Sequence, residues 1–465
     1  MAAEIPANAP RTLALADRLE RTPLGHAQMF ALSAMWFALS VLWGSLLTLI
    51  IPIQVEDMLR RSGLTAAQVT AQKPGILGLV VAAGAIVALI IPPIVGSLSD
   101  RSTHRLGRRR PYVIAGVAVT LVGLLGMVAP NNLLIYSTAY LLMQAGSNAA
   151  VAAYQGVIPD LVPKEQRGHA SGWLGMMSIL GNIVGLLLGS VGLSRVHADD
   201  LLTFGQQAGV YGVIIAILVV FLAITYFGVR ETPLAESPAP QTFVQMIKAL
   251  WISPREHPDF AWVWLTRFLV VMGFNTVQFF LLYFLQDVVG IGRDEISGYA
   301  ALMYLGLLIS AAVAAIVGGR VSDRRGRKPL IYLAGALMTL TAVAFIGYIA
   351  LHNLPLPGPF LAAFNSVFYC GIGFGIGYGI YQAVDWALGT DVLPGGDESA
   401  AKDLGVWHIA LVLPQSLATV LAGELLTATA AAGMSAGTRY SLVFAMSIFY
   451  FILGTILVRN VRGAR

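Results

Sequence analysis

The chain is built from long apolar segments separated by short polar ones. A helix needs roughly 20 predominantly apolar residues to cross about 30 Å of hydrocarbon, and runs of this kind occur twelve times. The runs are continuous and do not alternate residue by residue, so they predict spanning helices and not the strands of a transmembrane barrel. The predicted spans cover about 27–52, 74–98, 112–129, 131–158, 170–194, 205–228, 260–286, 297–319, 329–350, 360–388, 404–428 and 436–458.

The composition supports an all-α membrane protein. Of the 465 residues, 57% are hydrophobic and 11% are charged, whereas soluble domains are about 45–50% apolar and about 25% charged. These values exclude a water-soluble enzyme and a disordered chain. The single cysteine, Cys370, excludes an internal disulfide framework. Phosphate-binding loops, zinc signatures and nucleophile motifs are absent from the sequence, so we expect no cofactor, no metal site and no enzymatic activity.

The basic residues predict how the chain lies in the membrane. If both termini are cytoplasmic, the cytoplasmic segments hold 22 of the 29 lysines and arginines. This asymmetry follows the positive-inside rule. The net charge of +5 is therefore explained by basic residues that keep loops on the cytoplasmic side, and we expect no nucleic-acid partner. The predicted location is the cell membrane, with membrane lipids as partners.

A hydrophilic stretch divides the chain into two halves of six spans. It covers about 229–258 and contains four prolines, which is typical of a linker between two bundles. The predicted organisation is a cytoplasmic segment (1–26), an N-terminal bundle (27–228), the linker (229–258), a C-terminal bundle (259–458) and a cytoplasmic tail (459–465).

The two halves repeat each other. Segment 96–111 reads GSLSDRSTHRLGRRRP after the second span, and segment 318–329 reads GGRVSDRRGRKP after the eighth. The aspartates of these loops are 223 positions apart. A second repeated pattern starts at Tyr154 and again at Tyr381, 227 positions apart. It consists of Tyr-Gln followed by an aspartate, a proline and a tryptophan. Two unrelated signatures at nearly the same offset indicate an internal duplication.

Twelve spans with a G-x-x-x-D-R-x-x-G-R-R/K loop in each half resemble the major facilitator superfamily over the whole chain. Within that superfamily, segments 100–111 and 164–182 are similar to the sucrose–proton symporters and their glycoside–cation symporter relatives. The resemblance implies two six-helix bundles that rock about a central cavity and hold solute near the midplane.

The repeated loops are candidate gates at the cytoplasmic side. Helix N-termini favour anions, and the family geometry implies that Asp100 faces the start of span eleven, near Lys402. By the repeat, Asp323 would face the start of span five, near Lys164 and Arg167. The alternative is that the arginines only anchor the topology. The gating candidates are Asp100, Arg101, Arg108, Asp323 and Arg324.

Uncharged polar side chains near the span centres are the candidate solute site. A polar group in a span is costly unless it finds a partner or faces a wet cavity, and a set of amides at one depth suits a hydroxyl-rich solute. Alternatively, each amide could form a structural hydrogen bond between helices, and the aromatic residues could serve only to pack the helices together. The candidates are Gln144, Asn148, Asn182, Asn275, Gln278 and Gln415, with the aromatic residues Trp36, Trp43, Tyr378 and Tyr381.

Three ionisable residues in or near spans are candidates for a second role. Asp385, His408 and Arg267 fall toward the cytoplasmic side of the C-terminal half, where they could form an inner gate or structural pair, or exchange a proton. The plant-type sucrose symporters carry an embedded carboxylate in span four, but here 144–154 reads QAGSNAAVAAY. Three readings stay open: coupling has moved to Asp385, the protein is a facilitator, or the substrate differs.

The sequence thus predicts a monomeric secondary transporter that moves a small neutral polar solute, with a sugar or glycoside as the leading candidate, coupled to H⁺ or another cation such as Na⁺. One alternative keeps the fold but exports lipophilic compounds, with a cavity rich in Met and Phe. Another is a receptor or assembly factor on the same fold, whose function would survive locking of the cytoplasmic gate.

Overall fold

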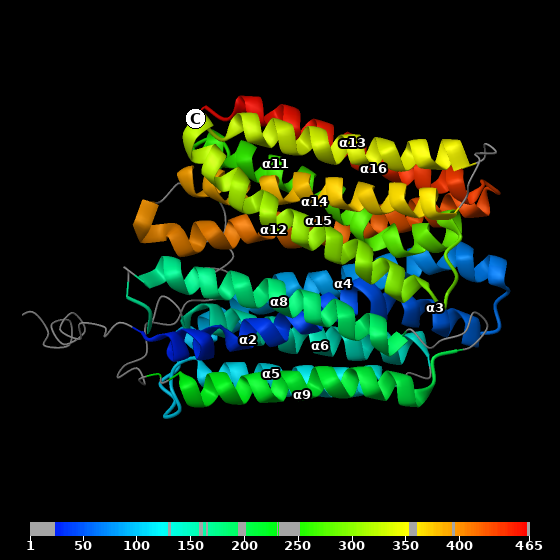
Figure 1. The fold of residues 1–465 in the computed structure, drawn as a ribbon. Helices are drawn as coiled ribbons and strands as arrows, with labels where there is room; N and C mark the ends of the chain where they lie inside the picture. Colours follow the sequence, from blue (N-terminus) through cyan, green and yellow to red (C-terminus); the bar gives the residue numbers. More distant parts are fainter. Residues whose placement is uncertain are drawn as a thin grey trace, which may run out of the picture.

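The computed structural model describes residues 24–128, 132–157, 161–163, 166–193, 201–229, 231, 252–352, 360–392 and 396–462. Over these residues the chain forms two helical bundles that lie side by side (Figure 1). Most of the predicted linker, 229–258, lies outside the described residues.

The N-terminal bundle begins with one long span in three parts. These are α2 (His26–Ser45), a π-helical turn η1 (Leu46–Ile50) and α3 (Ile51–Arg61). Its other helices are α4 (Ala66–Asp100), α5 (Arg110–Met127), α6 (Leu133–Gln155), α8 (Arg167–Leu193) and α9 (Phe204–Gly228).

The C-terminal bundle begins in a similar way. Helix α11 (Pro258–Phe284) runs into a π-helical turn, η3 (Leu285–Val289). It is followed by α12 (Ile296–Arg325), α13 (Lys328–His352), α14 (Phe360–Asp391), α15 (Gly396–Ala431), α16 (Ala436–Leu457) and the short 3₁₀ turn η4 (Val458–Asn460).

Each of the twelve predicted spans coincides with a helix, so the all-α architecture is confirmed. Eleven of the described helices are long and apolar enough to cross a membrane by length and composition alone. Some helices are longer than the predicted spans. The first span is predicted to end near residue 52 and the second to start near residue 74. The helices continue to Arg61 and start again at Ala66, because Glu56, Asp57 and Lys73 in these extensions are paired and buried.

Glycines bring the helices of each bundle into close contact, as expected where lipid supplies no hydrophobic drive between helices. A Cβ atom on Gly146 of α6 would lie 2.4 Å from the Thr120 backbone nitrogen of α5. A Cβ atom on Gly185 of α8 would lie 2.3 Å from the Val41 carbonyl oxygen of α2. Neither position has space for a larger residue without moving a backbone.

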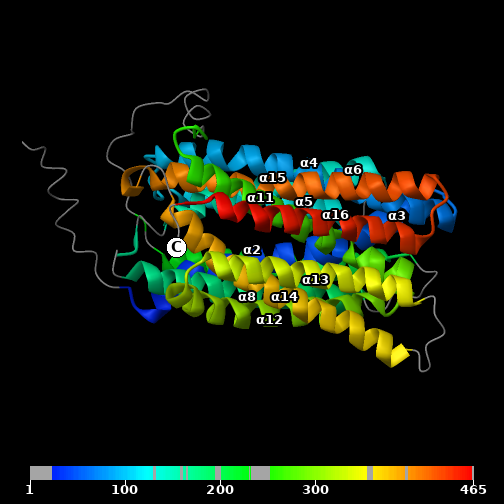
Figure 2. The same cartoon turned by 90° about the horizontal axis from the view of Figure 1, so that it is seen from above.

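The two bundles meet through two helix pairs, α4 with α15 and α8 with α12 (Figure 2). We call the side of the molecule that carries Asp100 the inner side, following the arginine distribution, and the opposite side the outer side. Gly78 and Gly96 are 18 residues apart on α4, which is five turns and therefore one helix face. A Cβ on Gly78, nearer the outer side, would lie 2.4 Å from the Thr419 carbonyl oxygen of α15, whereas a Cβ on Gly96 would meet nothing within 4 Å. The close contact at Gly78 is therefore not repeated at Gly96, which indicates that α4 and α15 diverge toward the inner side.

Candidate functional site

A cluster of five buried charged residues joins the bundles at the outer side. We call Glu56, Asp57, Lys73, Asp287 and Arg293 the outer clasp. Lys73 Nζ of the N-terminal bundle lies 2.9 Å from Asp287 Oδ1 of the C-terminal bundle and 3.4 Å from Glu56 Oε2. Arg293 of the C-terminal bundle donates to Asp57 Oδ1 at 2.9 Å and approaches Glu56 Oε1 at 3.8 Å.

Burial makes the outer clasp energetically important. The side chains of Lys73 and Arg293 are 3% and 6% exposed, and their acidic partners are 4–7% exposed. Removing one partner of such a pair leaves a buried charge uncompensated and costs about 3–5 kcal/mol. Tyr440 Oη of α16 also donates to Asp287 Oδ2 at 2.8 Å, which fixes the orientation of that carboxylate. These contacts hold the outer ends of the bundles together.

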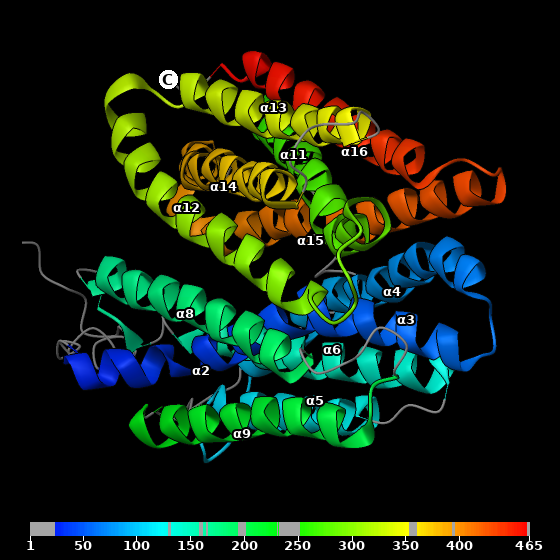
Figure 3. The ribbon, with the colours of Figure 1, turned by 45° about the vertical axis from the view of Figure 1, so that its right-hand side comes forward.

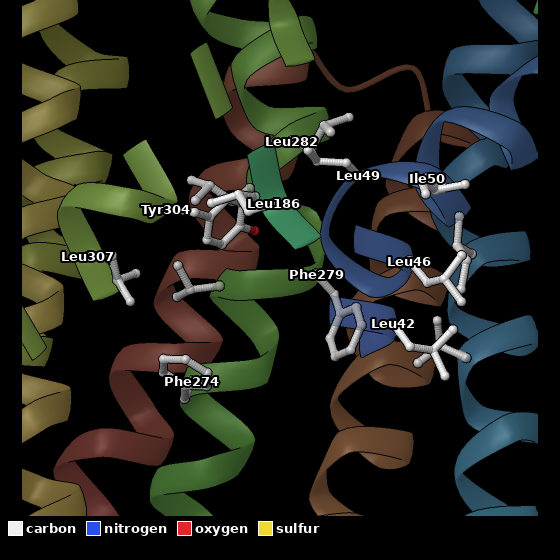
Figure 4. Close-up of a cluster of buried hydrophobic side chains, with 14 of the residues drawn as sticks. Leu42, Leu46, Leu49, Ile50, Leu186, Phe274, Phe279, Leu282, Tyr304 and Leu307 are labelled. Atoms are coloured by element: carbon white, nitrogen blue, oxygen red, sulfur yellow. The ribbon is translucent and has the colours of Figure 1, made fainter. Parts of the chain in front are cut away.

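An apolar layer lies next to the outer clasp. Figure 4 shows Leu46, Leu49 and Ile50 of the η1 turn near Phe279 and Leu282 of α11. All five side chains are buried. Tyr283 Oη donates to the Pro52 carbonyl oxygen at 2.9 Å, across the bundle boundary. The outer route between the bundles is therefore closed by charge pairs and by packed hydrocarbon.

The first repeated loop behaves differently at the inner side. Asp100 accepts from Arg108 at 2.8 Å and from Arg109 at 2.7 Å, both in its own loop, and its side chain is 50% exposed. The Arg109 amide in turn donates to Glu231 at 2.7 Å, and Arg110 donates to the Tyr226 carbonyl oxygen. In this conformation Asp100 is bound by two arginines of its own loop. Its expected position at the start of α15 stays a prediction, since the side chains there lie outside the described residues.

Some predicted gate contacts cannot be placed. The side chains of Asp323, Arg167 and Lys402, and the whole of Lys164, lie outside the described residues. Arg324 is exposed and Arg101 is half-buried.

Two matched contacts run between α11 and α14 in the C-terminal bundle. Arg267 Nη1 donates to Asp385 Oδ2 in a buried ion pair. Seven residues away on each helix, Phe274 and Tyr378 stack with ring centroids 3.8 Å apart. Seven residues are two turns, so both contacts lie on one antiparallel face of the two helices. We call this arrangement the α11–α14 ladder.

At the charged end of the α11–α14 ladder, both oxygens of the Asp385 carboxylate are bound. Tyr381 Oη donates to Asp385 Oδ1 at 2.9 Å, and the Arg267 guanidinium lies 4.6 Å from the ring centroid of Trp407 on α15. Tyr381 is 2% exposed, so it orients the carboxylate and does not offer its ring to a solute. The predicted grouping of Arg267 with Asp385 is thus present, while the side chain of His408 lies outside the described residues.

The amides on α6 form one connected group. Gln144 Nε2 donates to Tyr140 Oη at 2.7 Å, and Asn148 Nδ2 donates to Gln144 Oε1 at 3.1 Å. Gln144 is buried, whereas Asn148 is half-buried. Asn148 is therefore the more exposed of these two amides.

The other amides differ in their surroundings. Asn275 is buried and donates to the Val271 carbonyl oxygen of its own helix, while Gln278 and Gln415 are half-buried. Asn182 lies against Gly44 of α2, where a Cβ would come within 3.0 Å of its Oδ1, so its contacts are those of helix packing. Trp36 and Trp43 are half-buried on α2, and Trp36 contacts the ring of Tyr154.

Sequence reasoning missed the outer clasp. Its residues lie just beyond the apolar runs, so they were assigned to outer loops. A signal was available in the repeat, because Glu56-Asp57 and Gln286-Asp287 stand 230 positions apart, close to the offsets of the two motifs already recognised.

Comparison with known proteins agrees with this architecture. Residues 27–419 match the family description Major Facilitator Superfamily. The sucrose transport protein SUC4 of Arabidopsis thaliana is 23% identical over 391 residues, which cover 71% of this chain and 73% of that protein. The general alpha-glucoside permease of Schizosaccharomyces pombe is 30% identical over 163 residues, which cover 31% of this chain but only 29% of that permease. The crystal structure of a D-xylose-proton symporter superposes with a TM-score of 0.66 at 17% identity, over 93% of this chain and 99% of that one.

Proposed function

We propose that this chain, which belongs to the Major Facilitator Superfamily, is a secondary transporter of a sugar or glycoside that works by alternating access in the cell membrane, with both termini in the cytoplasm. The observation that carries the proposal is the unequal contact between the bundles. They are locked by buried pairs at the outer side and diverge along α4 and α15 toward the inner side. A carrier open to the inside has this form.

The chemistry of the half-buried polar groups supports a neutral, hydroxyl-rich solute. Asn148, Gln278 and Tyr378 come from three different helices and offer donors, acceptors and an aromatic ring. Gln382 Nε2 donates to Tyr378 Oη at 2.7 Å, which fixes the hydroxyl of that tyrosine. Two of the similar proteins named above are a sucrose transport protein and an alpha-glucoside permease, in keeping with this class of solute.

We assign coupling to H⁺ through Asp385. The carboxylate is buried and its negative charge is balanced by Arg267. When Asp385 takes up a proton, the ion pair is lost and the Arg267 guanidinium must find another acceptor, so the charge state of Asp385 is tied to the packing of α11 on α14. Return of the proton to the inner solution restores the pair. Span four, where the plant-type sucrose symporters carry a carboxylate, has no acidic residue here, so that site cannot supply the proton acceptor.

Uptake into proteoliposomes tests substrate and coupling together. A panel of sugars and glycosides is offered with and without an imposed pH or Na⁺ gradient. We expect at least one of them to accumulate when a pH gradient is imposed. Failure of every sugar would overturn the substrate class, and accumulation driven by Na⁺ alone would overturn the assignment of the proton.

The Asp385→Asn variant separates coupling from transport. Because asparagine mimics the protonated carboxyl, we expect loss of pH-driven accumulation with retained exchange of labelled for unlabelled sugar. Glu424→Gln is the matched control, since Glu424 is an exposed acid on α15. Full accumulation by Asp385→Asn would remove Asp385 from the coupling step.

The half-buried amides are tested by Asn148→Ala and Gln278→Ala. Loss of one hydrogen bond to a neutral solute costs about 0.5–1.5 kcal/mol, so we expect KM to rise about two- to tenfold with normal expression. Gln68→Ala, which removes an exposed amide at the outer start of α4, serves as the control. Unchanged KM in both test variants would place the solute elsewhere.

A further inference from the structure

A long groove on the outside of the C-terminal bundle is separate from the site described above. Its walls are α12 and α13 and its floor is α14, which lies between them in Figure 3. The groove has a volume of about 590 Å³. Its lining residues are Ser310, Val313, Ala314, Val317, Gly318, Val321, Arg325, Pro329, Leu330, Leu333, Ile376 and Ile380.

The floor of the groove is set by close packing of α12 on α14. A Cβ on Gly318 would lie 3.3 Å from the Ile380 Cα, and a Cβ on Gly379 would lie 2.1 Å from the Ala311 carbonyl oxygen. Helix α13 follows α12 after only two residues, yet it packs mainly against α14 and α16. The two walls therefore diverge and leave α14 uncovered between them.

The lining is apolar along its length. Val313 and Val317 on one wall and Leu333 on the other are 50–59% exposed, as expected for side chains that face hydrocarbon. The one hydroxyl, Ser310 Oγ, is already engaged with the carbonyl oxygens of Leu307 and Ile372 at 2.9 and 3.1 Å. The groove therefore has no polar group to recognise a water-soluble ligand except at its inner end.

A positive charge stands at that inner end. Arg325 is exposed and lines the groove, and the segment 320–328 holds five basic residues and one acidic residue. From Arg325 to Ser310 the helix rises about 22 Å, more than one leaflet's share of a hydrocarbon core about 30 Å thick. The groove can therefore accept an acyl chain from the level of the headgroups to the middle of the bilayer.

We propose that this groove binds one anionic phospholipid of the inner leaflet, with an acyl chain between α12 and α13 and the phosphate on Arg325. Basic residues beside transmembrane grooves attract anionic headgroups, and the guanidinium group suits a phosphate because it offers a planar fork of donors.

The binding is tested on the purified full chain in zwitterionic phosphatidylcholine nanodiscs. Phosphatidylglycerol is titrated in, and the lipid retained is counted by native mass spectrometry. A basic residue near the membrane surface contributes about 1 kcal/mol, or about fivefold in affinity. We expect Arg325→Gln to lose about fivefold of the phosphatidylglycerol binding. Arg320→Gln, an exposed arginine on the same helix that does not line the groove, should lose less than twofold.

A second pair of variants tests the acyl chain. Val317→Trp fills the groove and should displace the lipid, whereas Val343→Trp, on an exposed part of α13 outside the groove, should retain it. Equal losses in Arg325→Gln and Arg320→Gln would show diffuse attraction only and overturn the site. Equal retention in the two tryptophan variants, or equal binding of phosphatidylcholine and phosphatidylglycerol, would also overturn it.

Discussion

The outer and inner ends of the molecule use the same kinds of residue in opposite ways. At the outer end, Lys73 and Arg293 are buried and each binds an acid of the other bundle. At the inner end, Asp100 is half-exposed and its two arginines come from its own loop. The difference shows which contacts define the present conformation. The outer pairs must break before the outer side can open, whereas the pairs of Asp100 lie within one loop and do not join the bundles.

The outer clasp also reflects the internal duplication. Asp57 ends the first span of one half, and Asp287 ends the first span of the other. Asp57 binds Arg293 of the C-terminal half, while Asp287 binds Lys73 of the N-terminal half. Each half therefore contributes an acid and a base to this exchange. The two aspartates are equivalent by the repeat, whereas the bases are not, because Lys73 lies within α4 and Arg293 precedes α12.

The largest effect is expected from Lys73→Ala. Lys73 is the cation that Glu56 and Asp287 share, and its loss should cost the inward-open state about 3–5 kcal/mol. A cysteine placed at Leu49 behind the clasp, with Cys370 replaced by Ala, should then react faster with an impermeant thiol reagent added outside. Arg60→Ala, which breaks a partly exposed pair within α3, should change the rate little. Unchanged labelling in Lys73→Ala would show that the clasp does not hold the outer side closed.

A glycine pair on α4 gives the next largest effect. Gly78→Ala places a methyl group against the Thr419 carbonyl oxygen and should destabilise the closed outer side by about 1–3 kcal/mol. Gly96→Ala on the same face meets open space and should leave this state unchanged. Thermal unfolding of the two variants checks the difference. Equal melting temperatures would contradict the divergence of α4 from α15.

A double-mutant cycle tests the second pair of the clasp. Asp57→Asn, Arg293→Gln and the double variant should show a coupling energy of about 0.5–3 kcal/mol, measured by the same labelling at Leu49. A coupling energy near zero would mean that the two side chains contribute independently.

The smallest effect on stability is expected at the inner end. Asp100→Asn weakens its pairs with Arg108 and Arg109, but the aspartate is 50% exposed and Arg109 keeps its hydrogen bond to Ser99 Oγ, so the melting temperature should fall less than in Lys73→Ala. The transport cycle should nevertheless slow, because the aspartate is needed when the inner ends close. Uptake kinetics should therefore show a lower maximal rate with KM nearly unchanged, and a selective rise in KM would contradict the gating role.

The sequence could predict the spans and their order, because each is an apolar run long enough to recognise without tertiary information. It also placed Asp385 and Arg267 on the same side of the C-terminal half, Asp385 through the alignment of the repeats at Tyr154 and Tyr381 and Arg267 through its position at the start of a span. The repeat offset could have pointed to Asp57 and Asp287 of the outer clasp, but not to their pairing with Arg293 and Lys73, since those contacts join segments that are distant in the sequence. The partner of Asp100 expected in the other bundle stays a prediction, because the side chains at the start of α15 lie outside the described residues.

The π-helical turns η1 and η3 precede or contain the acids of the outer clasp in both halves. A π turn holds about one residue more than the α turn it replaces. If the π turn became a regular α turn, the part of the helix beyond it would rotate about the helix axis by the angle of one residue, about 100°. A rotation of that size at η1 would carry Glu56 and Asp57 off Lys73 and Arg293 without moving the rest of α2. Unlocking of the outer side can thus begin as a local change of winding, before either bundle tilts.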